Sequence, residues 1–459
     1  MTFPQSVSGG LPAPRSTPYG RLRAAPFDSD AQLPSDAPVV IIGGGILGVM
    51  TAWCLARRGV PALLCEKAEI ACESSSRAFG WVTELLSAPL KLALAQASKR
   101  LWRELQAEGE FGYREDGVAY LADSEEELGH FEAWLDSVRG IGDARSCLLD
   151  ADAVAQRYPG AARRYAGALL APSDGSIEPV ITTAAVAEAA RRLGARIVTG
   201  CAVRGLDVQA GRVAGVYTEK GYVRTASVLC AANTWSRLFC GNHGIDVPQL
   251  YAVFSMGRTD PLDSAPLGGG GQEAWAWRRQ IDGACSLGRV AGLRVPVTRD
   301  VLQQYRRFRP LIAAQQLGAA KPSFGRDAWN DLRLPRRWNP RETSPFEQLR
   351  VLSGRVDPQV AAESLRLNRA AFPAAFAHAR VAETWAGTLT LTPDNAPIVG
   401  PVEQVPGLHL LTGCGFGFSW GPALGEMTAD LITGATPAID ARPFRLSRFF
   451  DGSPLEITP

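Results

Sequence analysis

The stretch that most constrains this chain is Val39–Gly48, where a short apolar run passes directly into glycines. An apolar segment with helical periodicity follows, so the pattern predicts a strand, a tight turn and a helix. Gly43 allows the turn to close, Gly45 allows a pyrophosphate to approach the backbone, and Gly48 allows helix and strand to pack closely. A second apolar run ends in Glu66, at the spacing of an acid that binds ribose hydroxyls. The alternative is a βαβ unit that binds nothing.

The composition is that of a globular protein without a concentrated charge. The chain has 459 residues, 46% hydrophobic and 20% charged, which predicts two domains that share a large core. A formal net charge of +2 argues against nucleic acid as a partner. No apolar run approaches the roughly 18 residues that span a bilayer. The nine cysteines form no CxxC pair, so we expect reduced thiols, no metal site and, without a signal segment, a cytoplasmic location.

The ends and the middle of the chain differ in character. Residues 1–36 are rich in Pro, Ser, Gly and Ala without a sustained period, which predicts a flexible arm, and the alternative is an arm laid over the folded body at Tyr19 and Phe27. From about 240 to 375, aromatic-rich strand patterns alternate with Gly/Pro turns, which predicts a second, sheet-based domain.

Two further segments have the composition of a cofactor site. The segment from Ser74 to Trp81 carries three hydroxyls and an arginine directly after the βαβ unit, and the alternative is an ordinary polar loop. Near the C-terminus a strand at 408–411 leads into a glycine turn, and we expect a helix at 423–432 with Pro422 in its first turn. The free N–H groups there would stabilise negative charge.

These segments, in this order, resemble the FAD-dependent oxidoreductases of the D-amino-acid oxidase superfamily. The most similar group comprises glycine oxidase, sarcosine oxidase and γ-glutamylputrescine oxidase. The resemblance covers about residues 37–449 and includes Ala231–Ser236, Trp385–Gly387, Thr392–Asp394 and Pro443–Phe449.

The resemblance implies FAD as the cofactor. Its adenine end would lie in the N-terminal βαβ unit, with backbone contacts from Val203 to adenine, and the C-terminal glycine turn would lie under the flavin. The cofactor-binding residues that it implies are Gly43, Gly45, Ile46, Leu47, Gly48, Glu66, Lys67, Ser74, Ser75, Ser76, Arg77, Gly80, Trp81, Val203, Gly413, Cys414, Gly415, Phe416, Gly417 and Phe418.

The implied fold is α/β (α+β), with a Rossmann-like FAD-binding domain and a second, mainly antiparallel β-sheet substrate domain. Both domains are discontinuous in sequence. We assign residues 1–36 to the arm, 37–115, 165–240 and 380–440 to the FAD-binding domain, 116–164 and 241–379 to the substrate domain, and 441–459 to a C-terminal tail.

The implied reaction oxidises a C–N bond of an amine or amino acid to an imine by hydride transfer to flavin N5. The electrons would pass to oxygen, a quinone or a partner flavoprotein. Sarcosine oxidase-like members place a lysine near the flavin to promote reaction with oxygen, but none lies between Lys220 and Lys321 here, which favours a dehydrogenase. The alternative function is a flavoprotein subunit or scaffold of a larger dehydrogenase complex with an inactive pocket of its own.

Three positions depart from the family pattern. Gly387 stands where some members tether flavin through a cysteine, so we expect non-covalent FAD. Leu389 stands where glycine oxidase-like members grip the substrate carboxylate with an arginine. Phe416 stands where many members carry a histidine.

The catalytic residues stay unassigned from the sequence. The candidate pocket residues are Tyr251, Trp277, Arg278 and Phe416. For the aromatic residues the alternative is core packing, and for Arg278 it is a solvated strand end.

Overall fold

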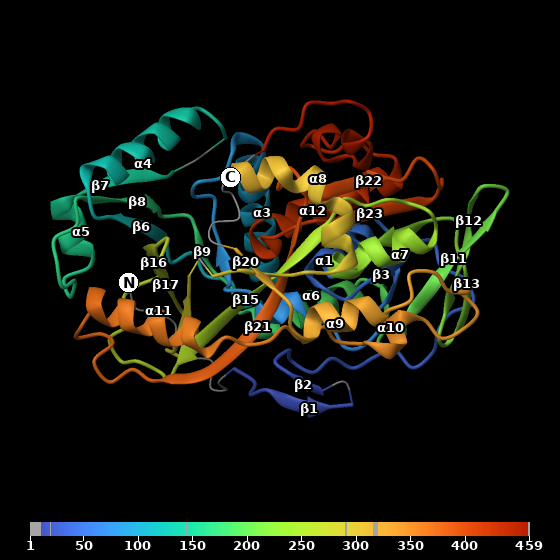
Figure 1. Ribbon diagram of the computed structural model, residues 1–459, viewed down its shortest axis with the longest axis horizontal. Coiled ribbons are helices and arrows are strands. Elements are labelled where there is room, and N and C mark those ends of the chain that lie inside the picture. The colour runs from blue at the N-terminus through green and yellow to red at the C-terminus, as the bar shows by residue number, and fades with distance from the viewer. Residues whose placement is uncertain (1–10, 19, 143–144, 290–291, 315–319, 458–459) are drawn as a thin grey trace.

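A computed structural model describes residues 11–457 except residues 19, 143–144, 290–291 and 315–319, so residues 1–10 and Tyr19 of the expected arm lie outside the described residues. The chain forms two main sheets that occupy opposite sides of the molecule in Figure 1. In the first sheet five strands run parallel and the sixth, at the edge, runs antiparallel. In spatial order these strands are β10 (Arg196–Val198), β4 (Leu63–Cys65), β3 (Val40–Ile42), β14 (Val228–Cys230), β23 (Leu408–Thr412) and β22 (Ile398–Pro401).

The first sheet is covered on both faces. Its strands β3, β4 and β14 are buried along their whole length, as expected for apolar runs in a parallel sheet. The helices on one face are α1 (Ile46–Arg57), α3 (Pro89–Glu108), α6 (Pro179–Arg192) and α12 (Gly417–Thr433). A three-stranded sheet lies against the other face, formed by β11 (Val203–Gln209), β12 (Arg212–Thr218) and β13 (Gly221–Arg224).

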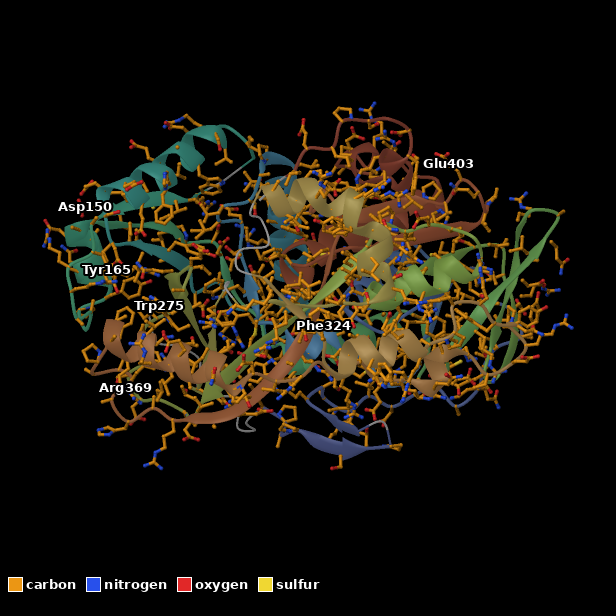
Figure 2. The ribbon with its side chains drawn as sticks, in the orientation of Figure 1. Asp150, Tyr165, Trp275, Phe324, Arg369 and Glu403 are labelled. Carbon is orange, nitrogen blue, oxygen red and sulfur yellow. The ribbon has the colours of Figure 1, made fainter. Side chains whose placement is uncertain are left out.

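The second sheet is mainly antiparallel, and helix α11 (Pro358–Ala371) covers one of its faces. Trp275 lies in that layer, among the strands on the left of Figure 2. The strand order is β20 (Lys321–Ser323), β19 (Arg294–Pro296), β15 (Leu250–Thr259), β18 (Cys285–Gly288), β17 (Trp275–Arg279), β16 (Gly269–Gln272), β6 (Val118–Ala122), β8 (Gly167–Ala171) and β7 (Cys147–Asp150), with β21 (Val381–Leu391) paired to β15. The expected fold class, mixed α/β with a parallel and an antiparallel sheet, is confirmed.

The remaining elements connect these layers. Among the described residues, no helix is both long and apolar enough to span a bilayer. The connecting helices are α2 (Ser74–Arg77), α4 (Glu125–Ser137), α5 (Ala151–Arg157), α7 (Ser236–Asn242), α8 (Arg299–Ala313), α9 (Arg326–Arg333) and α10 (Pro345–Gln348). The short strand pairs are β1 (Arg15–Thr17) with β2 (Gly20–Leu22), and β5 (Trp81–Val82) with β9 (Gly175–Ser176).

Two strands lie in a different sheet from the one that the expected domain ranges give them. Strands β8 and β21 fall in the ranges 165–240 and 380–440, yet both pair within the antiparallel sheet. Strand β21 pairs with β15 along its whole length, so hydrogen bonding to a strand about 130 residues earlier decides its place. A strand pattern read locally does not identify its partner strand.

The described part of the expected flexible arm is anchored, which corrects that expectation. Arg23 forms two hydrogen bonds with the carboxylate of Glu383, and its guanidinium carbon lies 3.5 Å from the ring centroid of Trp385. Burial lowers the pKa of Arg23 to about 10, although Glu383 opposes that shift. Leu22 is buried against the loop that carries Cys72. Glu383 and Trp385 lie about 360 residues further along the chain, so the composition of the arm alone does not reveal these anchors.

Helix α12 begins earlier than expected. It starts at Gly417 and contains Pro422 in its interior, so the expectation that Pro422 occupies the first turn was wrong. A proline cannot donate to the carbonyl four residues earlier, which here belongs to Phe418. The indole Nε1 of Trp102, on α3, donates to that carbonyl at 2.9 Å. A buried side chain therefore satisfies the acceptor that the proline leaves free.

We expect Trp102→Phe to lower the free energy of unfolding by about 1–3 kcal/mol, because it leaves the Phe418 carbonyl buried without a donor. The cost should be smaller in a Pro422→Ala background, where the helix itself supplies an N–H to that carbonyl. Urea unfolding of the four variants measures this coupling. Equal costs in both backgrounds would show that the Trp102 hydrogen bond does not compensate for the proline.

Candidate active site

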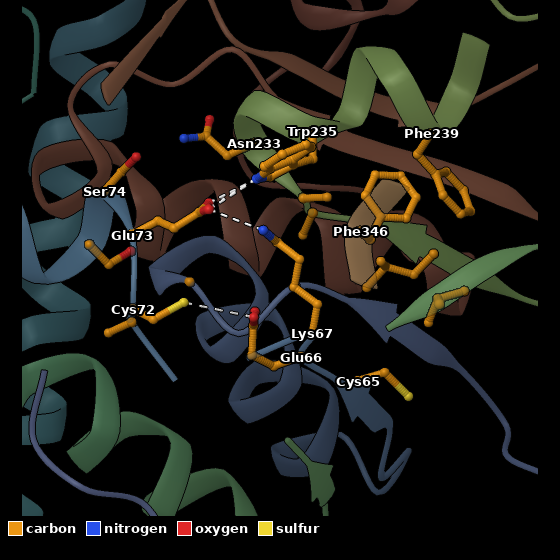
Figure 3. Close-up of a pocket in the computed structure, with 18 residues that line it drawn as sticks. Cys65, Glu66, Lys67, Cys72, Glu73, Ser74, Asn233, Trp235, Phe239 and Phe346 are labelled. Carbon is orange, nitrogen blue, oxygen red and sulfur yellow. Dashed lines mark hydrogen bonds and ion pairs between the residues drawn. The ribbon is translucent and has the colours of Figure 1, made fainter. Parts of the chain in front are cut away.

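A cavity lies at the carboxyl ends of β3 and β4, against the first glycine turn (Figure 3). It contains about 700 Å³ of space, including its opening to solvent. Seven residues that the sequence analysis assigned to cofactor binding line it: Gly43, Gly45, Glu66, Lys67, Ser74, Ser75 and Val203. Its other walls come from Ile42, Cys65, Ala71, Cys72, Glu73, Ala231, Ala232, Asn233, Trp235, Phe239 and Phe346.

The glycine turn allows backbone approaches that side chains would block. Gly43 has φ +114°, and a Cβ there would lie 2.6 Å from the carbonyl oxygen of Ala231. A Cβ on Gly48 would lie 2.0 Å from the carbonyl oxygen of Gly43. Gly45 is the N-cap of α1 and offers no side chain to the first turn, which also lacks acidic residues. The helix N-terminus therefore presents its positive end to the cavity.

Glu66 lies at the base of the cavity, at the end of β4. Its carboxylate accepts hydrogen bonds from the backbone N–H of Gly44 at 2.7 Å and of Ala68 at 2.8 Å. Burial raises the pKa of Glu66, while Lys67 and these two N–H groups oppose the shift. A carboxylate has about four lone-pair positions, so acceptor capacity is left for the hydroxyls of a ligand.

Glu73 is a wall residue that the sequence analysis missed. Its carboxylate accepts hydrogen bonds from the Trp235 indole at 3.0 Å and from Lys67 Nζ at 3.1 Å (Figure 3). It also accepts from the Leu352 N–H at 2.7 Å. Lys67 also donates to the carbonyl of Arg350 at 2.7 Å. The lysine therefore neutralises Glu73 and fixes the 349–352 loop. Glu73 stands in a polar run, so no local signal separates it from its neighbours.

The serine-rich segment folds as the short helix α2 and bridges three parts of the molecule. Ser75 Oγ accepts from the N–H of Ile46, in the first turn of α1, at 3.0 Å. Ser74 Oγ lies 2.9 Å from the hydroxyl of Thr388, on β21. Ser76 is fully buried outside the lining of the cavity.

The second half of this segment is also tied to the protein. Arg77 donates to the carbonyl of Leu352 at 2.8 Å, and burial lowers its pKa. Gly80 has φ +94°, and a Cβ there would lie 2.8 Å from Nε of Arg278. Trp81 packs edge-on against Phe79, with ring centroids 4.9 Å apart. These residues line neither described cavity. We call this segment, residues 77–81, which follows the lining residues Ser74 and Ser75, the wall.

The C-terminal glycine turn brings the start of α12 beside the start of α1. Gly413 has φ +73°, Cys414 is buried with its pKa raised by burial to about 12, and Phe416 is the N-cap of α12. A Cβ on Gly417 would lie 3.0 Å from the Ile46 side chain. Like α1, α12 lacks a capping hydrogen bond to the side chain of its N-cap residue, and it has no acidic residue in its first turn. Two helix N-termini without acidic residues thus lie close together.

The contact between α1 and α12 also involves the remaining residues that were predicted from the two glycine turns. A Cβ on Gly421 would lie 3.2 Å from the Leu47 side chain, so α12 approaches α1 closely at this position. Leu47 and Phe418 are buried in the same core. Gly415 lies under Leu389, whose side chain would be 3.5 Å from an added Cβ.

The four candidate pocket residues have different surroundings. Tyr251 lines a second cavity of about 560 Å³, where burial and three aspartates, Asp331, Asp327 and Asp300, raise its pKa. Phe416 is 53% exposed beside the glycine turn, with its ring 4.8 Å from that of Trp420.

Trp277 and Arg278 are both buried. Trp277 stacks on Trp275, with centroids 5.6 Å apart, in the core under α11. For Trp277, therefore, the alternative of core packing holds. Arg278 is 1% exposed, so it is not a solvated strand end. It donates to the Phe79 carbonyl at 2.6 Å and to Glu178 at 3.2 Å. Arg278 therefore supports the wall rather than lining either described cavity.

An apolar surface of the second sheet faces this wall. Gly288 approaches the Phe79 ring, 3.0 Å from an added Cβ, and Met256 lies next to it. The Phe254 ring covers Gly387, where an added Cβ would lie 2.3 Å from it. The sequence analysis also missed Lys91, which is buried near Cys414 with Nζ 5.2 Å from the Trp420 ring centroid. Burial lowers the pKa of Lys91 to about 8.

Comparison with known proteins identifies the family to which this chain, with its strand, glycine turn, helix and Glu66, is similar. The profile of the family described as DAO, FAD dependent oxidoreductase, matches residues 38–431. The chain belongs to this family. Its members use FAD, so the cofactor expected from the sequence is confirmed at the level of the family.

Three relatives of this FAD-dependent oxidoreductase illustrate the range of the family. Human mitochondrial sarcosine dehydrogenase is 29% identical over 53% of this chain, but the match covers only 28% of that relative's length. D-amino acid dehydrogenase of Rhizobium johnstonii is 26% identical over 78% of this chain and 74% of its own length. The structure of L-amino acid deaminase from Proteus myxofaciens in complex with anthranilate is 32% identical, with a TM-score of 0.89, over 93% of this chain and 97% of that one.

Glu66→Gln should weaken FAD binding by about 1.5–3 kcal/mol, on the order of tenfold to a hundredfold in Kd, because a neutral amide is a poorer acceptor for ribose hydroxyls. Titrating apoprotein with FAD and following flavin fluorescence measures the Kd. Glu69→Gln is the matched control, since Glu69 lies in the same loop, pairs with Arg15 and does not line the cavity. Equal Kd values for both variants and the wild type would contradict the assignment of Glu66.

Proposed function

We propose that this chain uses FAD to oxidise a C–N bond of an amino acid or amine to an imine. The observation that carries the proposal is the pairing of two helix N-termini, neither with an acidic residue in its first turn, beside the Glu66 cavity. Ile46 of α1 touches Gly417 of α12, so both positive helix ends face the same region. An extended, negatively charged dinucleotide suits that arrangement.

The residues present fit FAD along the length of the site. Glu66 would hold the ribose hydroxyls, the N–H groups at the start of α1 would hold the pyrophosphate, and Val203 would contact the adenine. The start of α12 would stabilise negative charge at the flavin end. When bound, FAD supplies the two-electron acceptor for the oxidation, chemistry that side chains lack.

The task of the chain is to exclude water and to orient the substrate. Phe254, Met256 and Leu389 offer an apolar surface close to Phe79 and to the glycine turn. Such a surface would hold the carbon that bears the amine in a reactive orientation and would favour the neutral amine over the ammonium ion.

We propose an amino acid with an apolar side chain as the substrate. Leu389 adds an apolar side chain to that surface, at the position where glycine oxidase-like members carry the arginine that grips the substrate carboxylate. The arginines near that surface are neutralised by carboxylates: Arg23 by Glu383, Arg258 by Asp282 and Arg278 by Glu178. The deaminase of Proteus myxofaciens, whose name specifies L-amino acids, supports an L-amino acid as the substrate.

For the electron acceptor we favour a quinone or a partner flavoprotein over oxygen. Strand β18 carries no lysine, and the residue that follows it is Arg289, whose delocalised guanidinium is not equivalent to a point charge. Buried Lys91, near Cys414 of the glycine turn, is a cation that would instead favour oxygen as the acceptor.

Anaerobic mixing of the FAD-loaded protein with amino acids tests the function. We expect L-leucine, L-phenylalanine or L-methionine to bleach the flavin absorbance, with glycine and sarcosine far slower. The matching D-amino acids serve as stereochemical controls. Flavin that stays oxidised with amino acids and with secondary amines would contradict the proposal and favour the scaffold with an inactive pocket.

We expect FAD to be released on denaturation, because Gly387 offers no side chain for a covalent link and the Phe254 ring fills the space above it. After precipitation with trichloroacetic acid, the flavin should appear in the supernatant in a 1:1 ratio to protein. Flavin that remains with the precipitated chain would show a covalent attachment at another residue.

A further inference from the structure

Three charged side chains are buried together behind the wall that carries Phe79 and Trp81. Glu84, Lys99 and Asp174 are each at most 3% exposed. Lys99 Nζ lies 2.6 Å from a Glu84 oxygen and 3.1 Å from an Asp174 oxygen. With both carboxylates ionised the group carries one net negative charge, which is costly to bury unless every polar atom is paired.

The surrounding hydrogen bonds satisfy this group. Lys99 donates its third hydrogen bond to Ser173, at 3.0 Å, and Ser146 donates to Glu84 at 2.9 Å. Asp174 also accepts from the Thr83 hydroxyl at 2.6 Å and from the Glu84 N–H at 3.0 Å. Four separate segments meet at this point: α3, the turn after β5, the turn before β9 and the residues before β7. A satisfied buried network of this kind specifies one geometry.

The network continues into the site through one hydroxyl. Ser419, in the first turn of α12, accepts from the Thr83 N–H at 3.1 Å and donates to the Trp81 carbonyl at 3.4 Å. Trp81 in turn packs on Phe79, which faces the second sheet at Gly288. The buried charges therefore connect the start of α12 to the wall.

We propose that Glu84, Lys99 and Asp174 are positioning residues that fix the separation between the Phe79–Trp81 wall and the start of α12, and that protonation of Asp174 loosens this arrangement and slows turnover. The inference rests on the proposed function, since it assigns that wall and that helix to the substrate and flavin ends of the site.

The pH range follows from the surroundings of Asp174. Burial raises its pKa from 3.8 to about 6; Glu84 adds to the shift and Lys99 opposes it. Tyr113 and Tyr120 also face Asp174, and burial raises their pKa values, so they stay neutral in this range. A raised carboxyl pKa means that the folded state binds the proton more tightly than the unfolded state does. Protonation near pH 6 therefore does not unfold the protein at this site.

The test uses the FAD-loaded enzyme and compares wild type, Asp174→Asn and the exposed control Asp152→Asn. The wild type should lose kcat below about pH 6, with KM changing little. Asp174→Asn should lower kcat on the order of tenfold to a hundredfold at pH 8 and should remove the pH dependence near 6. Lys99→Met should lower kcat similarly, and Lys99→Arg should restore part of it.

The flavin absorbance spectrum between pH 5 and 8, without substrate, tests the network independently of turnover. It should shift near pH 6 in the wild type and in Asp152→Asn, but not in Asp174→Asn. If Asp174→Asn fails to fold, Ser419→Ala removes the hydroxyl that connects Thr83 to Trp81 and replaces it in both measurements. Wild-type kcat and pH profile in these variants, with a spectrum independent of pH, would overturn the inference. If no substrate reduces the flavin of the wild type but its spectrum still shifts near pH 6, the proposed function is contradicted and the inference about the network is not.

Discussion

The structure depends on the close approach of backbones where β3 turns into α1. The carbonyl oxygen of Gly43 lies 2.0 Å from where a Gly48 Cβ would be, so strand and helix meet without side chains between them. Helix α12 approaches α1 in the same way, since a Cβ on Gly425 would lie 2.9 Å from the Cβ of Met50. Each contact holds two backbones close together. Together they place two positive helix ends at one edge of the first sheet, and the proposed cofactor site follows from that placement.

The charged residues near the site mainly form ion pairs that connect the segments around it. Asp394, in the turn between β21 and β22, accepts hydrogen bonds from Arg448 at 2.7 and 3.0 Å and so ties the C-terminal tail to that turn. Arg278 and Glu178 are likewise buried and paired under the Phe79 carbonyl. Removing one partner of such a pair costs about 3–5 kcal/mol, because a buried charge is left alone. The surface proposed for the substrate is apolar, and the charged side chains near it are already paired with one another.

The sequence predicted features that short-range physics decides. Glycine spacing and apolar periodicity gave β3, α1 and Glu66, because the turn needs those residues within a few positions. Contacts between segments far apart in the chain could not be predicted from the sequence. Helix α12 begins before Pro422 because Trp102, some 320 residues away, satisfies the carbonyl that the proline frees. The arm is anchored because Arg23 meets Glu383, and Glu73 lines the cavity because Lys67 and Trp235 converge on it. None of these partners is visible in a local pattern.

The most direct test of this account is a crystal structure of the protein with FAD bound. The account predicts the ribose hydroxyls on Glu66, the pyrophosphate against the N–H groups at the start of α1, the adenine beside Val203 and the flavin next to the turn at 413–418. Density for FAD in another cavity, or a flavin remote from the start of α12, would contradict it.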